Sequence, residues 1–209
     1  MKHIADFFDA LADRWDELCY HDPQKLNYIL KQSGLRQSMR ILDVGCGTGI
    51  LESYLLAHAP SKIVAVDLSP RMIKQAQLKY HTPLVDFRSM DVLDLKNEIF
   101  DYIIVYSAFP HFEYPEILIA HLAELTSPGG KLIICHSEGR VQINGHHDKQ
   151  AKRISFPLLK IEQVKSIMRR FFTIDKAEDT DQLYLICGTR KETIIRRNSN
   201  NSENKRYRE

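Results

Sequence analysis

Three alternating glycines near residue 45 predict a backbone turn that wraps around a ligand. An apolar run at residues 41–44 predicts a strand, and Gly45, Gly47 and Gly49 follow it directly, ahead of a helical pattern. Glycine reaches backbone angles that other residues avoid and lets a ligand approach the main chain closely. A dinucleotide-binding loop would carry its third glycine one position later, where this chain has Ile50. The loop therefore predicts a ligand site, but its pattern is not the dinucleotide one.

Three carboxylates at the ends of three successive predicted strands extend this site. Asp43 lies two residues before the first glycine, Asp67 closes the second strand and Asp91 closes the third. Because open α/β sheets bind ligands at the carboxyl ends of their strands, the three side chains should converge. Asp43 can balance an ammonium group, Asp67 can accept hydrogen bonds from both hydroxyls of a ribose, and Asp91 can accept one from an adenine amino group. Together they predict a site for a nucleoside joined to an amino acid.

The elements that must hold these side chains follow an α/β pattern, in which short apolar runs alternate with amphipathic stretches. Strands are predicted at residues 41–44, 62–66, 85–88, 102–106 and 131–135, with helices between them. Two final strands, at 172–177 and 183–189, are joined by a turn too short for a parallel crossover, so they must be antiparallel. The first segment predicts an amphipathic helix whose acidic residues face water, namely Asp6, Asp9, Asp13 and Asp16.

Five motifs occur in the order and approximate spacing of the class I S-adenosylmethionine-dependent methyltransferases: ILDVGCGTG, VAVDLSPRMI, the DVLDL around Asp91, FDYIIVYSAFPHF and SPGGKLIICH. Within that family the chain resembles the small-molecule branch that includes the ubiquinone and menaquinone biosynthesis enzymes. The resemblance covers residues 40–136 closely and the flanks more loosely. It implies a Rossmann-like, seven-stranded, mostly parallel sheet with helices on both faces and an antiparallel last strand. It also implies S-adenosylmethionine as cofactor, with in-line transfer of its methyl group to a small-molecule acceptor and S-adenosylhomocysteine as by-product.

The resemblance also implies which residues contact the cofactor. They are Asp43, Gly45, Cys46, Gly47, Gly49, Asp67, Leu68, Met72, Asp91, Val92, Tyr106 and Ser107. Asp43 would face the methionine portion, Leu68 and Met72 would flank the adenine, and Val92 would read the adenine edge beside Asp91. Tyr106 and Ser107 would lie near the transferring methyl. Cys46 is expected to pack in the loop and not to act as a nucleophile.

The acceptor side of the reaction needs a group that removes a proton, and histidine is the natural candidate near neutral pH. His111 and His136 fall at or after the ends of the fourth and fifth strands, which face the cofactor. We therefore hypothesise that one of them is the general base. Phe109 and Phe112 are expected to form part of the acceptor pocket, where aromatic faces favour the sulfonium charge.

The polar segment from residue 137 to 157 carries the clearest information about the substrate. One interpretation is a solvated loop between the fifth strand and the next helix. Another is an acceptor-binding lid in which Arg140 pairs with an anionic group while His146 and His147 contact the acceptor. A third possibility is a metal site, because imidazole and carboxylate ligands are at hand in His136, Glu138, His146, His147 and Asp148. No regular ligand spacing is present, so no metal is expected.

Length and composition limit the remaining choices. The 209 residues suit one domain, predicted to comprise a helical cap at 1–38, a cofactor-binding domain at 39–190 with a substrate lid at 137–160, and a disordered polar, basic tail at 191–209. A net charge of +2 does not favour a nucleic-acid partner. Four dispersed cysteines, with no signal peptide and no apolar run that spans a membrane, predict a cytoplasmic protein without a membrane partner.

Two other functions share parts of this pattern. An NAD-dependent oxidoreductase would have the same kind of sheet and a ribose carboxylate, but Ile50 and Asp91 disfavour it. A noncatalytic module that binds S-adenosylmethionine would keep every cofactor contact. The acceptor, the methylated atom and the oligomeric state are not determined by the sequence.

Overall fold

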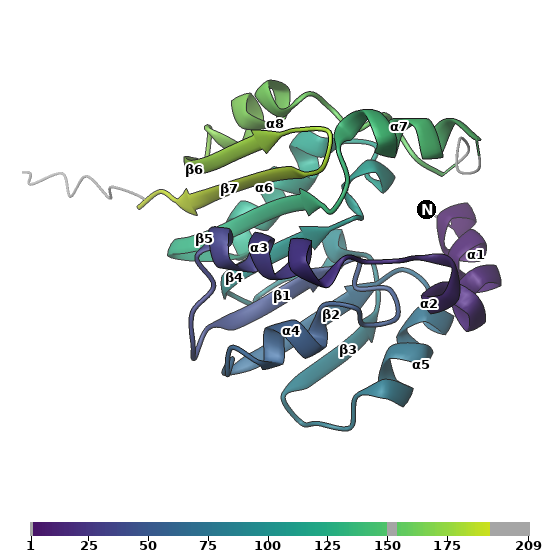
Figure 1. Cartoon of the computed structure of the whole chain (residues 1–209). Helices are drawn as coiled ribbons and strands as arrows, with labels where there is room; N and C mark the ends of the chain where they lie inside the picture. Colours follow the sequence, from purple (N-terminus) through teal and green to yellow (C-terminus); the bar gives the residue numbers. More distant parts are fainter. Residues whose placement is uncertain (1, 150–153, 193–209) are drawn as a thin grey trace, which may run out of the picture.

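The computed structural model describes residues 2–149 and 154–192, which form one sheet with helices on both faces (Figure 1). The seven strands lie in the order β3-β2-β1-β4-β5-β7-β6. Their bounds are Arg40–Val44 (β1), Lys62–Asp67 (β2), Val85–Ser89 (β3), Phe100–Tyr106 (β4), Thr126–His136 (β5), Phe172–Asp179 (β6) and Tyr184–Arg190 (β7). The predicted Rossmann-like, seven-stranded architecture is confirmed.

Strand pairing confirms the predicted final hairpin. Strands β1 to β5 pair in parallel, whereas β7 is antiparallel to both β5 and β6. Strand β5 begins earlier than expected, because Thr126 pairs with Phe100 ahead of a register shift. The parallel strands therefore all end at one edge of the sheet, where the glycine loop begins.

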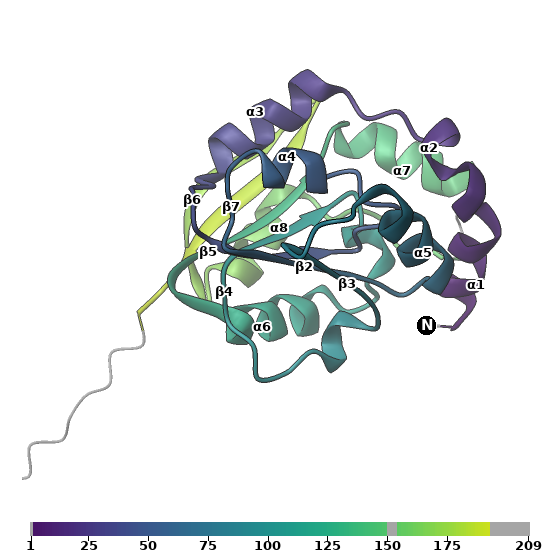
Figure 2. The same ribbon diagram turned by 90° about the horizontal axis from the view of Figure 1, so that it is seen from below.

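Helices cover the two faces of the sheet from opposite sides (Figure 2). Alternate residues of each strand feed two apolar clusters, one beneath α6 (Pro115–Leu125) and α8 (Ile161–Met168), the other beneath α3 (Pro23–Ser33) and α4 (Glu52–Leu56). Helix α5 (Pro70–Lys79) packs beside β2 and β3. Burial of both faces explains why the central strands β1, β2 and β4 are nearly continuous apolar runs, whereas the edge strand β6 alternates buried and exposed residues.

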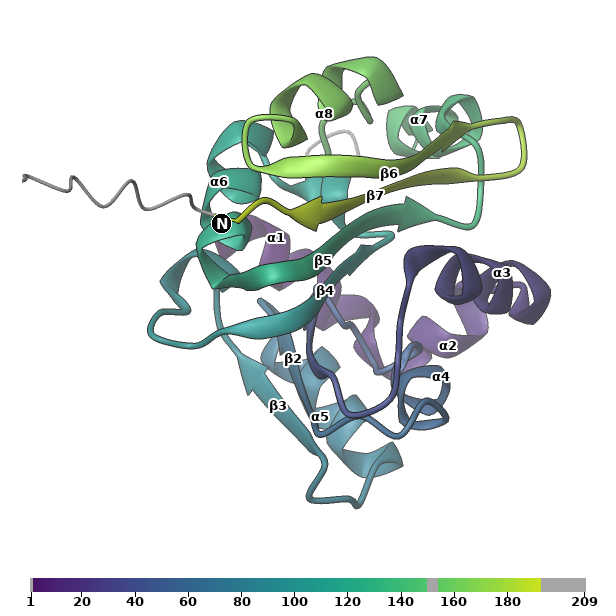
Figure 3. The ribbon, with the colours of Figure 1, turned by 90° about the vertical axis from the view of Figure 1, so that its left-hand side faces the viewer.

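The first residues of the chain lie across the carboxyl edge of the sheet. Helix α1 (Lys2–Leu11), the short η1 (Ala12–Arg14) and α2 (Trp15–Leu18) lie beyond the strand ends, and α7 (Arg140–Lys149) runs from the β6–β7 hairpin toward α1 (Figures 1 and 2). Seen from the opposite end of the sheet, α1 and α2 lie behind the strands (Figure 3). This arrangement places the predicted helical cap over the edge that carries the glycine loop.

Helix α7 corrects the sequence interpretation of residues 137–157, which predicted no helix there. Its Ile143 packs against the apolar cluster under α8. The side-chain oxygen of Asn144 accepts from the Leu158 amide at 2.7 Å, and its side-chain nitrogen donates to the Leu158 carbonyl at 3.3 Å. The polar composition concealed the helix because tertiary contacts, and not an apolar stripe, stabilise it. Across the residues that the structure describes, we find no helix with the length and apolar character needed to cross a bilayer.

Candidate functional site

The glycine loop lies at the carboxyl edge of the sheet, between β1 and α4. Gly45, Gly47 and Gly49 all have left-handed backbone angles, with φ of 72°, 54° and 86°. A β-carbon on Gly45 would lie 2.5 Å from the β-carbon of Ala108, so the loop abuts the segment that follows β4. The amides of Gly45 and Cys46 both donate to the carbonyl of Val66 at the end of β2. The loop is thereby tied to two neighbouring strand ends.

Asp67 joins this loop to the turn that begins α5. One carboxylate oxygen accepts from the Gly47 amide at 2.9 Å, and the other accepts from the Ser69 amide at 2.8 Å. Burial raises the pKa of Asp67, with a smaller contribution from Asp9, while the two amide bonds oppose the rise. Each carboxylate oxygen has a further lone pair available for a hydroxyl group. The geometry fits the predicted ribose contact.

Asp43 and Glu52 form a buried pair of carboxyl groups beneath the loop. The two residues are 1% and 0% exposed. Among the described residues, no hydrogen-bond donor reaches Asp43 Oδ2 or either carboxylate oxygen of Glu52. Burial and the charge of Asp67 raise the pKa of Asp43 to about 7, and burial together with Asp43 raises that of Glu52 well above its usual range. Buried carboxylates without donors fit a cationic ligand, such as the ammonium of an amino acid.

Glu52 was missed by the sequence interpretation, although it left a signal. It is an acidic residue in the first turn of α4, flanked by Leu51 and Leu55, both of which are buried. A charged residue on the buried side of a short helix next to a ligand loop is unusual, because an unpaired buried charge is costly. Its place beside Gly49 links it to the cofactor site, since Glu52 Oε2 lies 3.3 Å from where a β-carbon on Gly49 would be.

Asp91 lies just beyond the third strand, not within it. It caps the short helix η2 (Val92–Asp94), where one carboxylate oxygen accepts from the Leu93 amide at 3.0 Å. Val92 is buried, and its carbonyl accepts from His121 at 2.8 Å. Met72 is also buried, whereas Leu68 is half-buried. The predicted adenine contacts stay predictions, and their positions at the ends of β2 and β3 are compatible with them.

The helical cap is bound to the site by its acidic residues, which corrects the expectation that they only face water. Asp9 accepts from the Ser69 hydroxyl and from the Arg71 amide at 3.0 Å. Asp13 pairs with Arg71 and with Gln75, and Asp16 pairs with Thr48 and Lys79. Asp13 and Asp16 remain largely exposed at the same time. Their contacts tie the cap to the glycine loop and to α5.

An aromatic residue of the cap also reaches the loop. Trp15 Nε1 lies 3.7 Å from the position that a β-carbon on Gly47 would occupy, and the Trp15 ring contacts Phe8 edge-on at 5.4 Å. Phe8 in turn contacts the ring of His111 edge-on at 5.0 Å. The first two helices therefore cover both the loop and the segment that follows β4.

The two candidate bases lie in different surroundings. His111 is in η3 (Phe109–His111), with Nδ1 at 3.0 Å from the Ile154 carbonyl and 3.1 Å from the Ser155 hydroxyl. His136 is the last residue of β5, is 1% exposed and contacts the ring of Tyr184 edge-on. The hypothesis that either is the base stays open, because no acceptor is defined.

The predicted acceptor residues are similarly dispersed. Phe109 is 2% exposed within the apolar core, and Phe112 packs against that core. Arg140 is paired with Asp179 at 3.3 Å. His146 and His147 fall in α7, but their side chains lie outside the described part of the chain. No three described His, Cys, Asp or Glu side chains are grouped in a way that could hold a metal ion.

The residues at the end of β4 form a hydrogen-bonded cluster that the sequence interpretation only partly found. Tyr106 is 4% exposed, and its hydroxyl donates to Ser137 Oγ at 2.9 Å. His21, which was not predicted, lies with Nδ1 at 2.8 Å from the same hydroxyl. Ser107 adopts φ of 53°, and its amide donates to the Cys135 carbonyl. Nothing in the local sequence around His21 indicates this contact.

The fold and the loop together define a Rossmann-like domain with a glycine loop at the carboxyl edge of its sheet. Residues 42–134 match the family described as Methyltransferase domain. This matched segment includes most of the motifs that resemble the S-adenosylmethionine-dependent methyltransferases.

The chain is also similar to individual proteins that are described as methyltransferases. The ubiquinone biosynthesis O-methyltransferase of Xanthomonas oryzae pv. oryzae (strain PXO99A) is 35% identical over 141 residues, which cover 62% of this chain and 58% of the relative. The chain thus matches somewhat over half the length of its curated relatives. A Haloferax volcanii putative methyltransferase, in complex with the Trm112 activator, has a TM-score of 0.76 at 16% identity, covering 88% of this chain and 98% of that one.

A second solved structure has the product of the cofactor bound. It is the N-methyltransferase NodS from Bradyrhizobium japonicum WM9 in complex with S-adenosyl-l-homocysteine. Its TM-score is 0.71 at 17% identity, covering 90% of this chain and 99% of that one. These structural likenesses show the fold, and they cover a larger share of the chain than the matched motifs do.

Proposed function

We propose that this protein transfers the methyl group of S-adenosylmethionine to a hydroxyl oxygen of a small-molecule acceptor. The observation that carries the proposal is the buried pair Asp43 and Glu52 beside the glycine loop, with Asp67 at the next strand end. The pair fits the ammonium of the methionine portion and Asp67 fits the ribose. Oxygen is proposed as the methylated atom because the similar curated proteins are named O-methyltransferases.

The residues of the chain would position the reactants and exclude water. The Gly45, Gly47 and Gly49 turn lets the cofactor approach the main chain, and the cap over it shields the site from solvent. When bound, S-adenosylmethionine supplies an electrophilic methyl group and a good leaving group, so no covalent enzyme intermediate is needed. Alignment of two reactants alone lowers a barrier by roughly 7–11 kcal/mol. A side chain that accepts the acceptor's proton would contribute a further 10²- to 10⁴-fold or so.

The acceptor would enter between the end of β4 and the cap. Phe109, Phe112 and His111 remain proposed parts of its pocket, and Arg140, His146 and His147 remain proposed contacts from α7. The Arg140 pair with Asp179 would then have to open for an anionic acceptor. A small hydroxylated aromatic compound, such as a catechol, matches this combination of aromatic and basic side chains.

The localisation proposed is the cytoplasm. The four cysteines Cys19, Cys46, Cys135 and Cys187 are all free thiols, which agrees with a reducing compartment. No nucleic-acid partner is proposed, because the net charge is only +2.

The test is methyl transfer from isotopically labelled S-adenosylmethionine to a panel of catechols and to a small-molecule extract, followed by mass spectrometry. A labelled product with one added methyl on oxygen supports the proposal. Label on nitrogen or carbon would correct the methylated atom. Tight cofactor binding without any labelled product would favour a noncatalytic module, and binding of NAD in place of S-adenosylmethionine would favour an oxidoreductase.

A further inference from the structure

His21 is bound at the carboxyl edge of the sheet by Tyr106, which in turn bonds Ser137. It lies in the link between α2 and α3, with Nδ1 at 2.8 Å from the Tyr106 hydroxyl and its ring centroid 5.4 Å from that of Tyr106. Tyr106 ends β4, and its hydroxyl also meets Ser137, which follows β5. A surface histidine in a flexible link would not have such fixed partners.

The hydrogen bonds around Tyr106 determine which nitrogen of His21 carries the proton. The Tyr106 hydroxyl donates its single proton to Ser137 Oγ at 2.9 Å. His21 Nδ1 must then donate to the tyrosine oxygen, because a hydroxyl has one hydrogen to give. In the neutral ring this leaves Nε2 without a hydrogen and able to accept one. Tyr106 thus selects the tautomer of His21 in which Nε2 is basic.

The charges that face His21 suit a group that gains and then releases a proton. Burial lowers the pKa of His21, so the ring is neutral near pH 7, while Asp16 of α2 and Glu138 beyond β5 act in the opposite direction. Both carboxylates stabilise the imidazolium once the proton arrives. The ammonium group of Lys25 on α3 is engaged by other acceptors, because its Nζ donates to the Ser137 carbonyl at 2.9 Å and to Gln182 at 3.2 Å.

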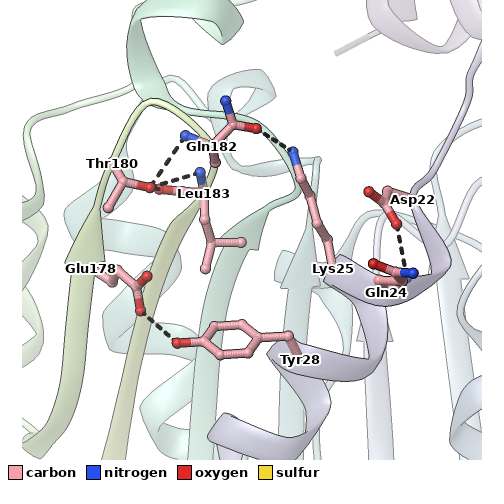
Figure 4. Close-up of a pocket in the computed structure, with 8 residues that line it drawn as sticks. All are labelled: Asp22, Gln24, Lys25, Tyr28, Glu178, Thr180, Gln182 and Leu183. Atoms are coloured by element: carbon pink, nitrogen blue, oxygen red, sulfur yellow. Dashed lines mark hydrogen bonds between the residues drawn. The ribbon is translucent and has the colours of Figure 1, made fainter.

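The link that carries His21 is anchored at its downstream end. Asp22 caps α3 through the Gln24 amide, and Lys25 and Tyr28 bind the β6–β7 hairpin through Gln182 and Glu178 (Figure 4). These contacts hold the start of α3 next to the sheet edge. The position of His21 is therefore set by the folded core.

The strand end that binds His21 also adjoins the glycine loop. Tyr106 is followed by Ser107 and Ala108, and the Ala108 β-carbon would touch a β-carbon placed on Gly45 at 2.5 Å. The end of β4 and the cofactor loop are therefore in contact. An acceptor held between the cap and this strand end would lie beside His21.

We propose that His21 is the general base of the methyl transfer and that Tyr106 is the residue that positions it. This inference rests on the proposed function, with a hydroxyl compound as acceptor. The acceptor oxygen forms a bond to the methyl carbon while the carbon–sulfur bond breaks and its electron pair goes to sulfur. The hydroxyl proton passes to His21 Nε2, and the imidazolium then releases it to water. His21 thus replaces His111 and His136 as the base that the geometry favours.

The first test needs no acceptor, so it separates this inference from the proposed function. The ring nitrogens of ¹⁵N-histidine-labelled protein are observed by NMR between pH 5 and 9, with S-adenosylhomocysteine bound. At pH 7 the His21 ring is expected to be neutral and protonated on Nδ1, and Tyr106→Phe should abolish that preference. A wild-type ring protonated on Nε2 would overturn the proposal.

The second test measures turnover with the catechol that the wild-type protein methylates fastest. His21→Gln keeps a donor for Tyr106 but cannot take a proton, so kcat should fall by about 10²- to 10⁴-fold. The dissociation constant for S-adenosylhomocysteine should stay unchanged, and the acidic limb of the kcat–pH profile should disappear. His81→Gln, an exposed histidine at the amino edge of the sheet, is the matched control and should behave as wild type. Wild-type kcat in His21→Gln would overturn the assignment, and loss of turnover in His111→Gln or His136→Gln would then identify the base.

Discussion

At the scale of single residues, the buried carboxyl pair is the most unusual feature of this protein. Asp43 and Glu52 each have a raised pKa in the folded chain, so the folded state binds more protons than the unfolded state between their ordinary and raised pKa values. Stability in the absence of ligand therefore falls as pH rises through this window, from 3.8 to about 7 for Asp43. A cationic ligand beside the two carboxylates would offset the cost of ionising them in the folded protein. Binding of such a cofactor should therefore depend on pH.

Glu52→Gln should stabilise the ligand-free protein at pH 8 by about 1–3 kcal/mol, because it removes a buried carboxyl group whose raised pKa makes folding less favourable at that pH. At pH 4, where both carboxyl groups are protonated, the same substitution should have little effect. Urea unfolding at the two pH values measures the difference. Affinity for S-adenosylmethionine should fall in the variant and should rise with pH through 7 in the wild type. A Glu52→Gln protein less stable at pH 8 than the wild type would contradict the charge argument.

Gly45 allows a controlled test of the loop. Gly45→Ala combines a left-handed backbone angle with a clash at 2.5 Å, whereas Gly129→Ala has a similar φ of 76° and nothing within 4 Å of the new β-carbon. Gly45→Ala should therefore be more destabilising than Gly129→Ala by about 1–3 kcal/mol, the usual cost of overpacking. Chemical denaturation of both variants isolates the clash. Equal losses would mean that Ala108 moves aside at no cost.

At the scale of elements, the cap is the part of the fold best suited to move. Helices α1 and α2 reach the site through Asp9, Asp13 and Asp16, and two of these residues are largely exposed. Exposed ion pairs each contribute only about 0–1 kcal/mol and weaken in salt. The contacts are thus strong enough to order the cap and weak enough to let it open for the cofactor.

The variant Asp9→Asn/Asp13→Asn/Asp16→Asn should increase hydrogen exchange of the α1 amides several-fold, because local opening becomes less costly. Exchange in β1 and β4, which belong to the core, should stay unchanged. Asp6→Asn is a suitable control, since Asp6 is exposed on the same helix. Bound S-adenosylhomocysteine should slow α1 exchange in the wild type. Unchanged exchange rates of the α1 amides in the triple variant would show that apolar packing alone holds the cap.

At the scale of the whole molecule, the glycine loop, the strand ends and the cap are joined by direct contacts, so a ligand bound among them should stabilise the fold as a whole. S-adenosylhomocysteine at 100 times its dissociation constant should add about 2.7 kcal/mol. For a chain of this size that corresponds to a rise in Tm of roughly 5–10 °C. A thermal-shift measurement with NAD at the same concentration is the comparison. A larger shift with NAD would overturn the proposed function.

Local pattern determined much of this protein. The apolar runs that end at Val44 and Asp67 identified buried strands, the glycines marked the turn, and the short turn before β7 implied the antiparallel hairpin, because each signal depends on neighbouring residues. The cofactor class followed from carboxylates at strand ends, a position that strand periodicity fixes. Helix α7 was not predicted from the sequence because the contacts that stabilise it, with Leu158 and the core, are made by residues distant in the chain.

Tertiary structure alone decided which distant residues meet. Asp9 and Asp16 read as a solvated helix face, yet they bind Ser69 and Thr48 because the cap folds back over the sheet edge. Glu52 became a partner of Asp43, and His21 a partner of Tyr106 across 85 positions, once the strands were aligned. Periodicity records whether a side chain is buried or exposed, but not its partner, since a partner is chosen by the packing of whole elements.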